Sequence, residues 1–156
     1  MPSAVVSRLP ERGLELPSPL REPRSRQECR ARATDLVYSS GNGSLSGTEL
    51  PHAGKLGVGL TLQQRGEAGA LTAPKAVDGL LGEGIDLDGA RWVTAFGIVN
   101  GHPLFLARAA IVNGFSETNV ELFGEKRGLH ARPACGMASM PRDIPVEIKA
   151  ICELPR

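Results

Sequence analysis

The last part of the chain shows the clearest alternation of apolar and polar residues. Four apolar residues alternate with four others, three of which are charged: Val146, Ile148, Ala150 and Cys152 against Glu147, Lys149, Ile151 and Glu153. Successive side chains of a strand point to opposite faces of a sheet, so the apolar set predicts the core side. We therefore expect a strand over residues 145–153.

Three more strands are expected upstream. Residues 132–140 precede a Pro-Arg-Asp-Ile segment at 141–144, which favours a tight hairpin with the last strand. The β-branched and aromatic residues of 91–99 predict a central strand. One face of that strand would carry Trp92, Thr94, Phe96 and Ile98. Residues 36–38 predict a short strand that ends in a turn over 39–43, where Gly41 would take a positive φ.

Two segments have helical patterns. Thr61 and Gln64 have capping-box spacing and predict a helix over 61–81, which Pro74 would kink or split. Its glycines should weaken it, and its expected inward residues are Leu62, Leu71, Val77, Leu80 and Leu81. A second helix from Pro103 to a Gly124 cap would bury Phe105, Ala109, Val112, Ser116, Val120 and Phe123, with Asn113-Gly114 as a weak point.

This order of elements predicts an α+β fold in which one mixed sheet carries two main helices on a single face. Residues 1–34 are expected to form an N-terminal arm, with a short helix at 3–13 and an extended or looped stretch at 16–32. This arm would pack on a single domain formed by 35–156. The sheet face without helices would be exposed, and burying it against further copies of the chain predicts an oligomer.

Composition narrows the class of protein. The 156 residues are 41% hydrophobic and 22% charged, as in an ordinary globular domain. A net charge of +1 and 4% aromatic residues make nucleic acid an unlikely partner. We expect no membrane span, because no run approaches roughly 20 apolar residues. Three cysteines without a C-x-x-C pair, and an N-terminus broken by prolines, predict a reduced cytoplasmic protein without a signal peptide.

Few residues have patterns that suggest chemistry. His52, His102 and His130 lack metal-ligand spacing, so no metal site is expected and each histidine is taken as a loop residue. Cys135 has no evident neighbouring base, which favours a buried structural cysteine over a nucleophile. Arg132 and Glu147 could bind a carboxylate and activate a water, although their pattern alone favours ordinary surface charges. A hairpin would not place them side by side, so a joint role predicts a site across a subunit boundary.

The residues from 113 to 154, NGFSETNVELFGEKRGLHARPACGMASMPRDIPVEIKAICEL, resemble the C-terminal half of RidA (YjgF-like) proteins. The similarity includes the FGE-x-x-G-x-HAR pattern of a divergent branch. Upstream, ERGLELPSP, DLVYSSG and GKLGVGLTLQQ resemble the arm, the first strand and the following loop of that family. The resemblance therefore covers nearly the whole chain.

This resemblance implies a chorismate-mutase-like fold, assembled as a homotrimer with ligand sites between subunits. It implies an imine deaminase, a hydrolase that converts small 2-imino acids such as 2-aminoacrylate into 2-oxo acids and ammonia without a metal or an organic cofactor. Arg132 would bind the substrate carboxylate and Glu147 would position the attacking water. The other expected substrate contacts are Gly41, Ala134, Cys135 and Ser116.

Two departures from the family pattern keep other functions open. Gln27 stands where many active members have tyrosine, and Pro133 replaces the usual serine or threonine after the arginine. They motivate the alternative of a non-catalytic homotrimer that binds small carboxylates or has a regulatory role. A third possibility, RNA cleavage, has little support, because the sequence has no basic stripe and no histidine pair suited to general acid and base catalysis.

Overall fold

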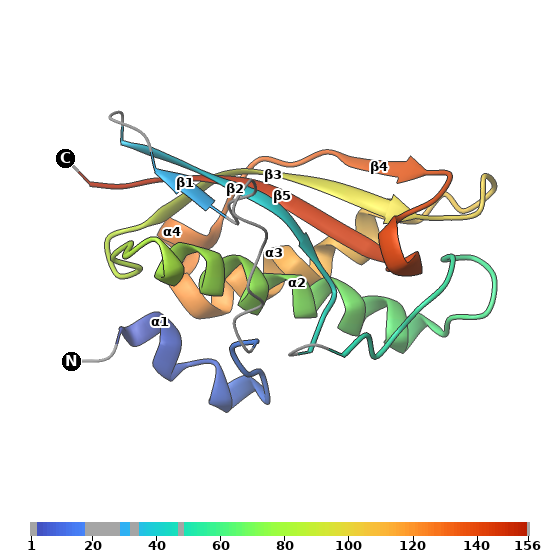
Figure 1. Cartoon of the computed structure of the whole chain (residues 1–156), viewed down its shortest axis with the longest axis horizontal. Coiled ribbons are helices and arrows are strands. Elements are labelled where there is room, and N and C mark those ends of the chain that lie inside the picture. The colour runs from blue at the N-terminus through green and yellow to red at the C-terminus, as the bar shows by residue number, and fades with distance from the viewer. Residues whose placement is uncertain (1–2, 18–28, 32–34, 47–48, 156) are drawn as a thin grey trace.

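The computed structural model describes residues 3–17, 29–31, 35–46 and 49–155, and they form a five-stranded mixed sheet with helices packed on one face (Figure 1). The strands are β1 (Cys29–Ala31), β2 (Leu36–Gly43), β3 (Arg91–Asn100), β4 (Ala134–Met137) and β5 (Val146–Glu153). The helices are α1 (Ala4–Ser7), α2 (Leu62–Gly82), α3 (Arg108–Phe123) and α4 (Glu125–Gly128), with single 3-10 turns at Pro10–Arg12 and Pro141–Asp143. The predicted α+β fold with two main helices on one face is confirmed.

The order of strands in the sheet is β1-β2-β5-β3-β4, which contradicts the predicted hairpin at the C-terminus. β3 lies between β4 and β5, and pairs parallel with β4 and antiparallel with β5. Because α3 connects β3 to β4, the chain returns to the same end of the sheet and the two strands run parallel. The 3-10 turn at Pro141–Asp143 therefore belongs to a connection that passes the end of β3 instead of joining neighbouring strands.

β5 has the alternation predicted for it. Val146, Ile148, Ala150 and Cys152 are buried, whereas Lys149 is exposed. The alternate side chains of β5 therefore separate the helix-covered face of the sheet from the open face.

β3 contains an irregularity in its pairing, and because of it Trp92 faces the side of the sheet opposite to the one predicted. The pairing with β5 shifts between Trp92 and Thr94, as at a β-bulge, where an extra residue changes which side chains face the core. Trp92 is consequently buried, with its ring 6.0 Å from the ring of Phe115. Thr94 and Phe96 face the other side, opposite Ile151 and Lys149 of β5. The prediction that Trp92 shares their face is wrong.

β2 continues through the residues predicted to form a turn. Its pairing with β5 is irregular between Tyr38 and Gly41, and Asn42 is buried there. The Asn42 amide donates to Ser39 Oγ at 3.2 Å and to the carbonyl of Ile148 at 3.1 Å, which stabilises the irregular segment. Gly41 is not among the glycines with positive φ, so that prediction is also wrong.

The capping box that begins α2 is confirmed. Thr61 Oγ1 accepts from the Gln64 amide at 3.2 Å, and the Gln64 side chain accepts from the Thr61 amide at 2.9 Å. Pro74 lies inside the helix without splitting it. Val77 and Leu80 are buried as predicted, whereas Leu71 and Leu81 are half-buried.

α3 begins at Arg108, later than predicted, and its buried face is rotated from the expected one. The buried residues are Ile111, Val112, Phe115, Thr118, Asn119, Leu122 and Phe123. Ala109 is exposed and Ser116 and Val120 are half-buried, because the side chains nearest the sheet follow positions 111, 115 and 122. The cap at Gly124, with a φ of 79°, is confirmed.

Gly69 and Gly114, which are predicted to weaken their helices, lie where α2 and α3 touch. A Cβ on Gly69 would overlap the carbonyl oxygen of Ile111, and a Cβ on Gly114 would overlap the backbone of Gly66. The two helices therefore cross with their backbones in direct contact. This contact offsets the cost of glycine in a helix.

The N-terminal segment packs on the same core. Val5 and Leu9 are buried, and Asp88 accepts hydrogen bonds from Ser3 Oγ at 3.0 Å and from the Ala4 amide at 3.1 Å. None of the described helices is long and apolar enough to cross a membrane.

We predict opposite effects for two glycine substitutions within α2. Gly69→Ala should lower the free energy of unfolding by about 1–3 kcal/mol, because its methyl group has no space against α3. Gly66→Ala should raise it by about 0.5–1 kcal/mol, because that position is open and alanine favours the helix. Urea unfolding of both variants tests this, and similar losses in both would contradict the crossing described above.

Candidate functional site

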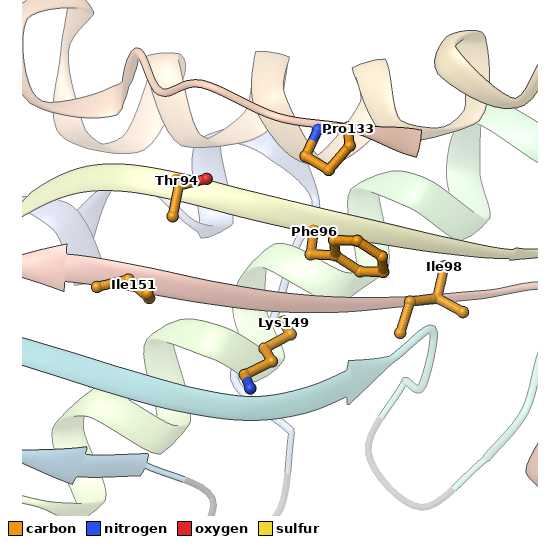
Figure 2. Close-up of a pocket in the computed structure, with 6 residues that line it drawn as sticks. All are labelled: Thr94, Phe96, Ile98, Pro133, Lys149 and Ile151. Atoms are coloured by element: carbon orange, nitrogen blue, oxygen red, sulfur yellow. The ribbon is translucent and has the colours of Figure 1, made fainter. Parts of the chain in front are cut away.

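The open face of the sheet carries a shallow apolar groove. Its volume is about 510 Å³, and it is lined by Thr94, Phe96 and Ile98 of β3, Lys149 and Ile151 of β5, and Pro133 just before β4 (Figure 2). Phe96 is 42% exposed, and Tyr38 of the neighbouring strand β2 is 37% exposed. A chain of this size thus leaves large apolar side chains uncovered on the face opposite α2 and α3.

Glu147 lies beside this groove on the same face. It is paired with Ile98 of β3 on one side and with Gly43 of β2 on the other. A Cβ on Gly41 would overlap the Glu147 carboxylate, so only glycine leaves this carboxylate its place. The structure thus brings together two residues that the sequence singled out, and it explains Gly41 by close approach instead of by positive φ.

Cys135 is exposed, which corrects the expectation of a buried structural cysteine. It pairs with Ile98 on the side opposite to Glu147, so the three residues form a row across β4, β3 and β5. Two strand spacings, about 10 Å, separate Cys135 from Glu147. The cysteine thus lies on the same face as the carboxylate but outside hydrogen-bonding range of it.

Arg132 lies at the edge of the sheet and its side chain points toward α3. One guanidinium nitrogen donates to the carbonyl of Ala109 at 3.2 Å, and another donates to Oδ1 of Asn113. The Asn113 side chain of α3 thus holds the guanidinium of Arg132 in place. No functional role for Asn113 is predicted from the sequence, although Asn113 precedes Ser116 by one helical turn.

Ala134 adds a backbone donor at the same edge. The carbonyl of Pro133 accepts from the Gly97 amide at 3.1 Å, so it points toward β3. Because the carbonyl and amide groups of one trans peptide point in opposite directions, the N–H of Ala134 points away from β3. β4 is the last strand of the sheet, so this N–H lies on its outer edge.

Arg132 and Glu147 therefore lie far apart within one chain. β3 separates their strands, and the arginine faces the helix side while the carboxylate faces the open side. Two strand spacings amount to about 10 Å across the sheet, before any offset along the strands. One small ligand cannot contact both groups of a single chain.

Ser116 and His130 form a hydrogen-bonded pair close to the arginine. Ser116 Oγ is 3.0 Å from His130 Nε2, and His130 Nδ1 is 2.8 Å from the carbonyl oxygen of Gly128. A carbonyl can only accept, so Nδ1 carries the hydrogen, and in the neutral ring Nε2 accepts from the Ser116 hydroxyl.

The charge state of His130 follows from its surroundings. Burial lowers its pKa below the ordinary value of 6.5; the bond to Gly128 opposes this shift and the positive charge of Arg132 adds to it. His130 is therefore neutral at pH 7. The sequence pattern predicts only a loop role for His130, although its position two residues before Arg132 is a signal that the two side chains lie close together.

Two further predictions concern Gln27 and the absence of a metal site. Gln27 lies outside the described residues. Over the described ranges, with their gaps at 18–28, 32–34 and 47–48, histidine, cysteine and acidic side chains form no group of three that could hold a metal ion.

Comparison with known proteins gives one curated relative with a partial match. No family model matches the chain. Protein TCP17 of Trypanosoma cruzi is 34% identical over 102 residues, which are 65% of this chain and 64% of that protein. The match therefore spans less than two thirds of that relative.

Solved structures match over most of the chain. A protein of unknown function from Agrobacterium tumefaciens is 28% identical with a TM-score of 0.86, and the match covers 97% of this chain and 92% of that one. A candidate endoribonuclease from Shewanella oneidensis is 23% identical with a TM-score of 0.86, over 96% and 99% of the two chains. RidA from a Psychrobacter species is 17% identical with a TM-score of 0.54, over 88% and 93%.

We predict that His130 makes stability depend on pH. The unfolded chain protonates this histidine near 6.5 whereas the folded protein does so only at lower pH, so the unfolded state binds more protons just below pH 6.5. The free energy of unfolding should rise with pH through this window and level off above it. Urea titrations from pH 5 to 8 should show a smaller slope of the free energy of unfolding against pH in His130→Gln than in the unmodified protein. An equal slope in His130→Gln and the unmodified protein would rule out this role.

Proposed function

We propose, from the premise that this chain has the fold of the RidA/YjgF family, that it hydrolyses small 2-imino acids to 2-oxo acids and ammonia. The observation that carries the proposal is the guanidinium of Arg132, which Asn113 holds near the edge of the sheet where the N–H of Ala134 points outward. A guanidinium and a backbone N–H together suit the carboxylate that 2-imino acids carry beside the reacting carbon.

Glu147 supplies the other part of the reaction. Its carboxylate accepts a proton from a water molecule, whose oxygen bonds to C2 of the imine while the C=N electron pair takes up a proton at nitrogen. The resulting carbinolamine then loses ammonia as its C–N bond breaks, and its hydroxyl becomes the 2-oxo group. Water is the only co-reactant, so the proposed reaction requires no metal and no organic cofactor.

The site is proposed to lie between two copies of the chain. Arg132 and Glu147 face opposite sides of one sheet, so the carboxylate clamp of one subunit would meet the glutamate of another. Burial of the groove around Phe96 would stabilise such an assembly. We propose a homotrimer with three equivalent sites, located in the cytoplasm.

Ser116 has a supporting role in this proposal. Its hydroxyl hydrogen is directed to His130, which leaves the lone pairs of Ser116 Oγ available to the substrate near Arg132. Cys135 lies on the same open face, two strands away from Glu147, and is proposed to line the ligand site.

The experiment is hydrolysis of 2-aminoacrylate or 2-iminobutanoate, generated in the assay by a separate enzyme. Arg132→Ala should lower kcat/KM by roughly 10- to 100-fold through loss of charge-assisted hydrogen bonds. Glu147→Gln should lower kcat by about 100-fold or more, with a smaller effect on KM, through loss of the base. The matched control Arg91→Ala removes an exposed arginine paired with Glu153 and should leave the rate unchanged.

A non-catalytic carboxylate-binding protein is the second candidate, because Pro133 after the arginine brings no hydroxyl and no amide hydrogen to the site. A folded protein without turnover that binds 2-oxobutanoate, and loses this binding in Arg132→Ala, would establish that function and exclude the deaminase. RNA is a third test substrate. Cleavage that survives in the Arg132→Ala, Glu147→Gln double variant would come from elsewhere.

A further inference from the structure

A second cavity lies at the end of the parallel strand pair, away from the proposed imine site. β3 and β4 end at the same edge of the sheet, and the chain between them enters α3 close by (Figure 1). The cavity has a volume of about 250 Å³, and it lies among Lys55, Pro103, Arg108 and residues 136–138. Arg132 does not line this cavity, although its guanidinium donates to the carbonyl of Ala109, the residue after Arg108.

The side chains of this cavity give it a net positive charge. Lys55 and Arg108 both line it, and none of the described lining residues is acidic. The Lys55 ammonium donates to the carbonyl of Ala138, and Arg108 Nη2 donates to the carbonyl of Pro103 at 3.4 Å. Neither cation forms an ion pair with an acidic group in the described part of the chain. Two charges are therefore held at one cavity by neutral oxygens.

The Arg108 side chain is also fitted to this place. Its Nε is buried and has no hydrogen-bond partner among the described residues. A Cβ on Gly136 would overlap this Nε, so the strand has glycine where the guanidinium lies across it. This fit against Gly136 holds the guanidinium of Arg108 at the cavity.

The backbone around the cavity also favours a negatively charged ligand. The cavity lies beyond the carboxyl ends of two parallel strands, at the amino end of the 16-residue helix α3. Ala107, the residue before α3, makes no side-chain cap, so the first amides of α3 are not satisfied in that way. These amides add partial positive charge next to the two cations.

We propose that the Lys55–Arg108 cavity binds the phosphoryl group of a small phosphorylated metabolite. Two cations match the charge of a phosphoryl group, which is about −1.5 to −2 at neutral pH, better than the single charge of a carboxylate. This site uses Lys55 and Arg108, whereas the proposed imine chemistry uses Arg132 and Glu147.

Inorganic phosphate is the probe for this site. It is titrated into the full-length protein at pH 7.5 and constant ionic strength, and backbone amide shifts are followed by NMR. Saturable shifts are expected for residues 101–108 and 136–138. Lys55→Gln and Arg108→Gln should each weaken phosphate binding by about tenfold, the effect of losing a charge-assisted hydrogen bond. The controls Lys126→Gln and Arg91→Gln, which remove exposed cations elsewhere, should bind phosphate normally.

Three outcomes would overturn the proposal. Shifts that do not saturate, or that weaken equally in Lys126→Gln, would indicate general attraction of anions. Binding that is lost in Arg132→Ala but kept in Lys55→Gln would place the phosphate at the carboxylate clamp. Acetate that binds as tightly as phosphate would contradict a phosphoryl site. If Arg108→Gln fails to fold, Lys55→Gln decides the question alone, because its side chain makes a single hydrogen bond to a loop carbonyl.

Discussion

β5 pairs with β2 on one side and with β3 on the other, and this central position determines how the sheet presents its side chains. Pairing on both sides fixes the direction of every β5 side chain, so Val146 and Ile148 face the helices while Glu147 and Lys149 face the open side. The same pairing brings Gly41 of β2 beside the Glu147 carboxylate. It also separates this carboxylate from β4 by the full width of β3. The pairing of β5 thus determines both the packing of the core and the positions of the proposed site residues.

Some of this arrangement could be predicted from the sequence, because it depends on local patterns. The alternation of β5, the capping box at Thr61 and the glycine cap after Phe123 are short-range signals, and the structure has all three. The family resemblance supplied Arg132 and Glu147 as a pair, which the local pattern alone could not distinguish from surface charges.

The predictions that failed depend on contacts between distant segments. The sequence of a strand does not show which strand pairs with it. The predicted hairpin therefore paired β4 with β5, although β3 lies between them. The bulge after Trp92 and the continuation of β2 through Gly41 with an irregular pairing both depend on register with β5. Cys135 is predicted to be buried because no neighbouring base is evident, whereas it lies exposed on the edge strand β4. Gly69 and Gly114 looked unfavourable because their cost is local, whereas their benefit lies in the contact between two helices.

The central claim is that one site requires Arg132 from one copy of the chain and Glu147 from another. Arg132→Ala and Glu147→Gln proteins, each with lowered activity alone, are mixed, unfolded and refolded together, and hydrolysis of 2-iminobutanoate is measured against the same proteins refolded separately. Random assembly should restore intact sites at about a quarter of the interfaces, because each site needs one subunit of each kind in the correct order. Recovery to roughly that level only after joint refolding would support the shared site. No recovery from folded, mixed assemblies would contradict it.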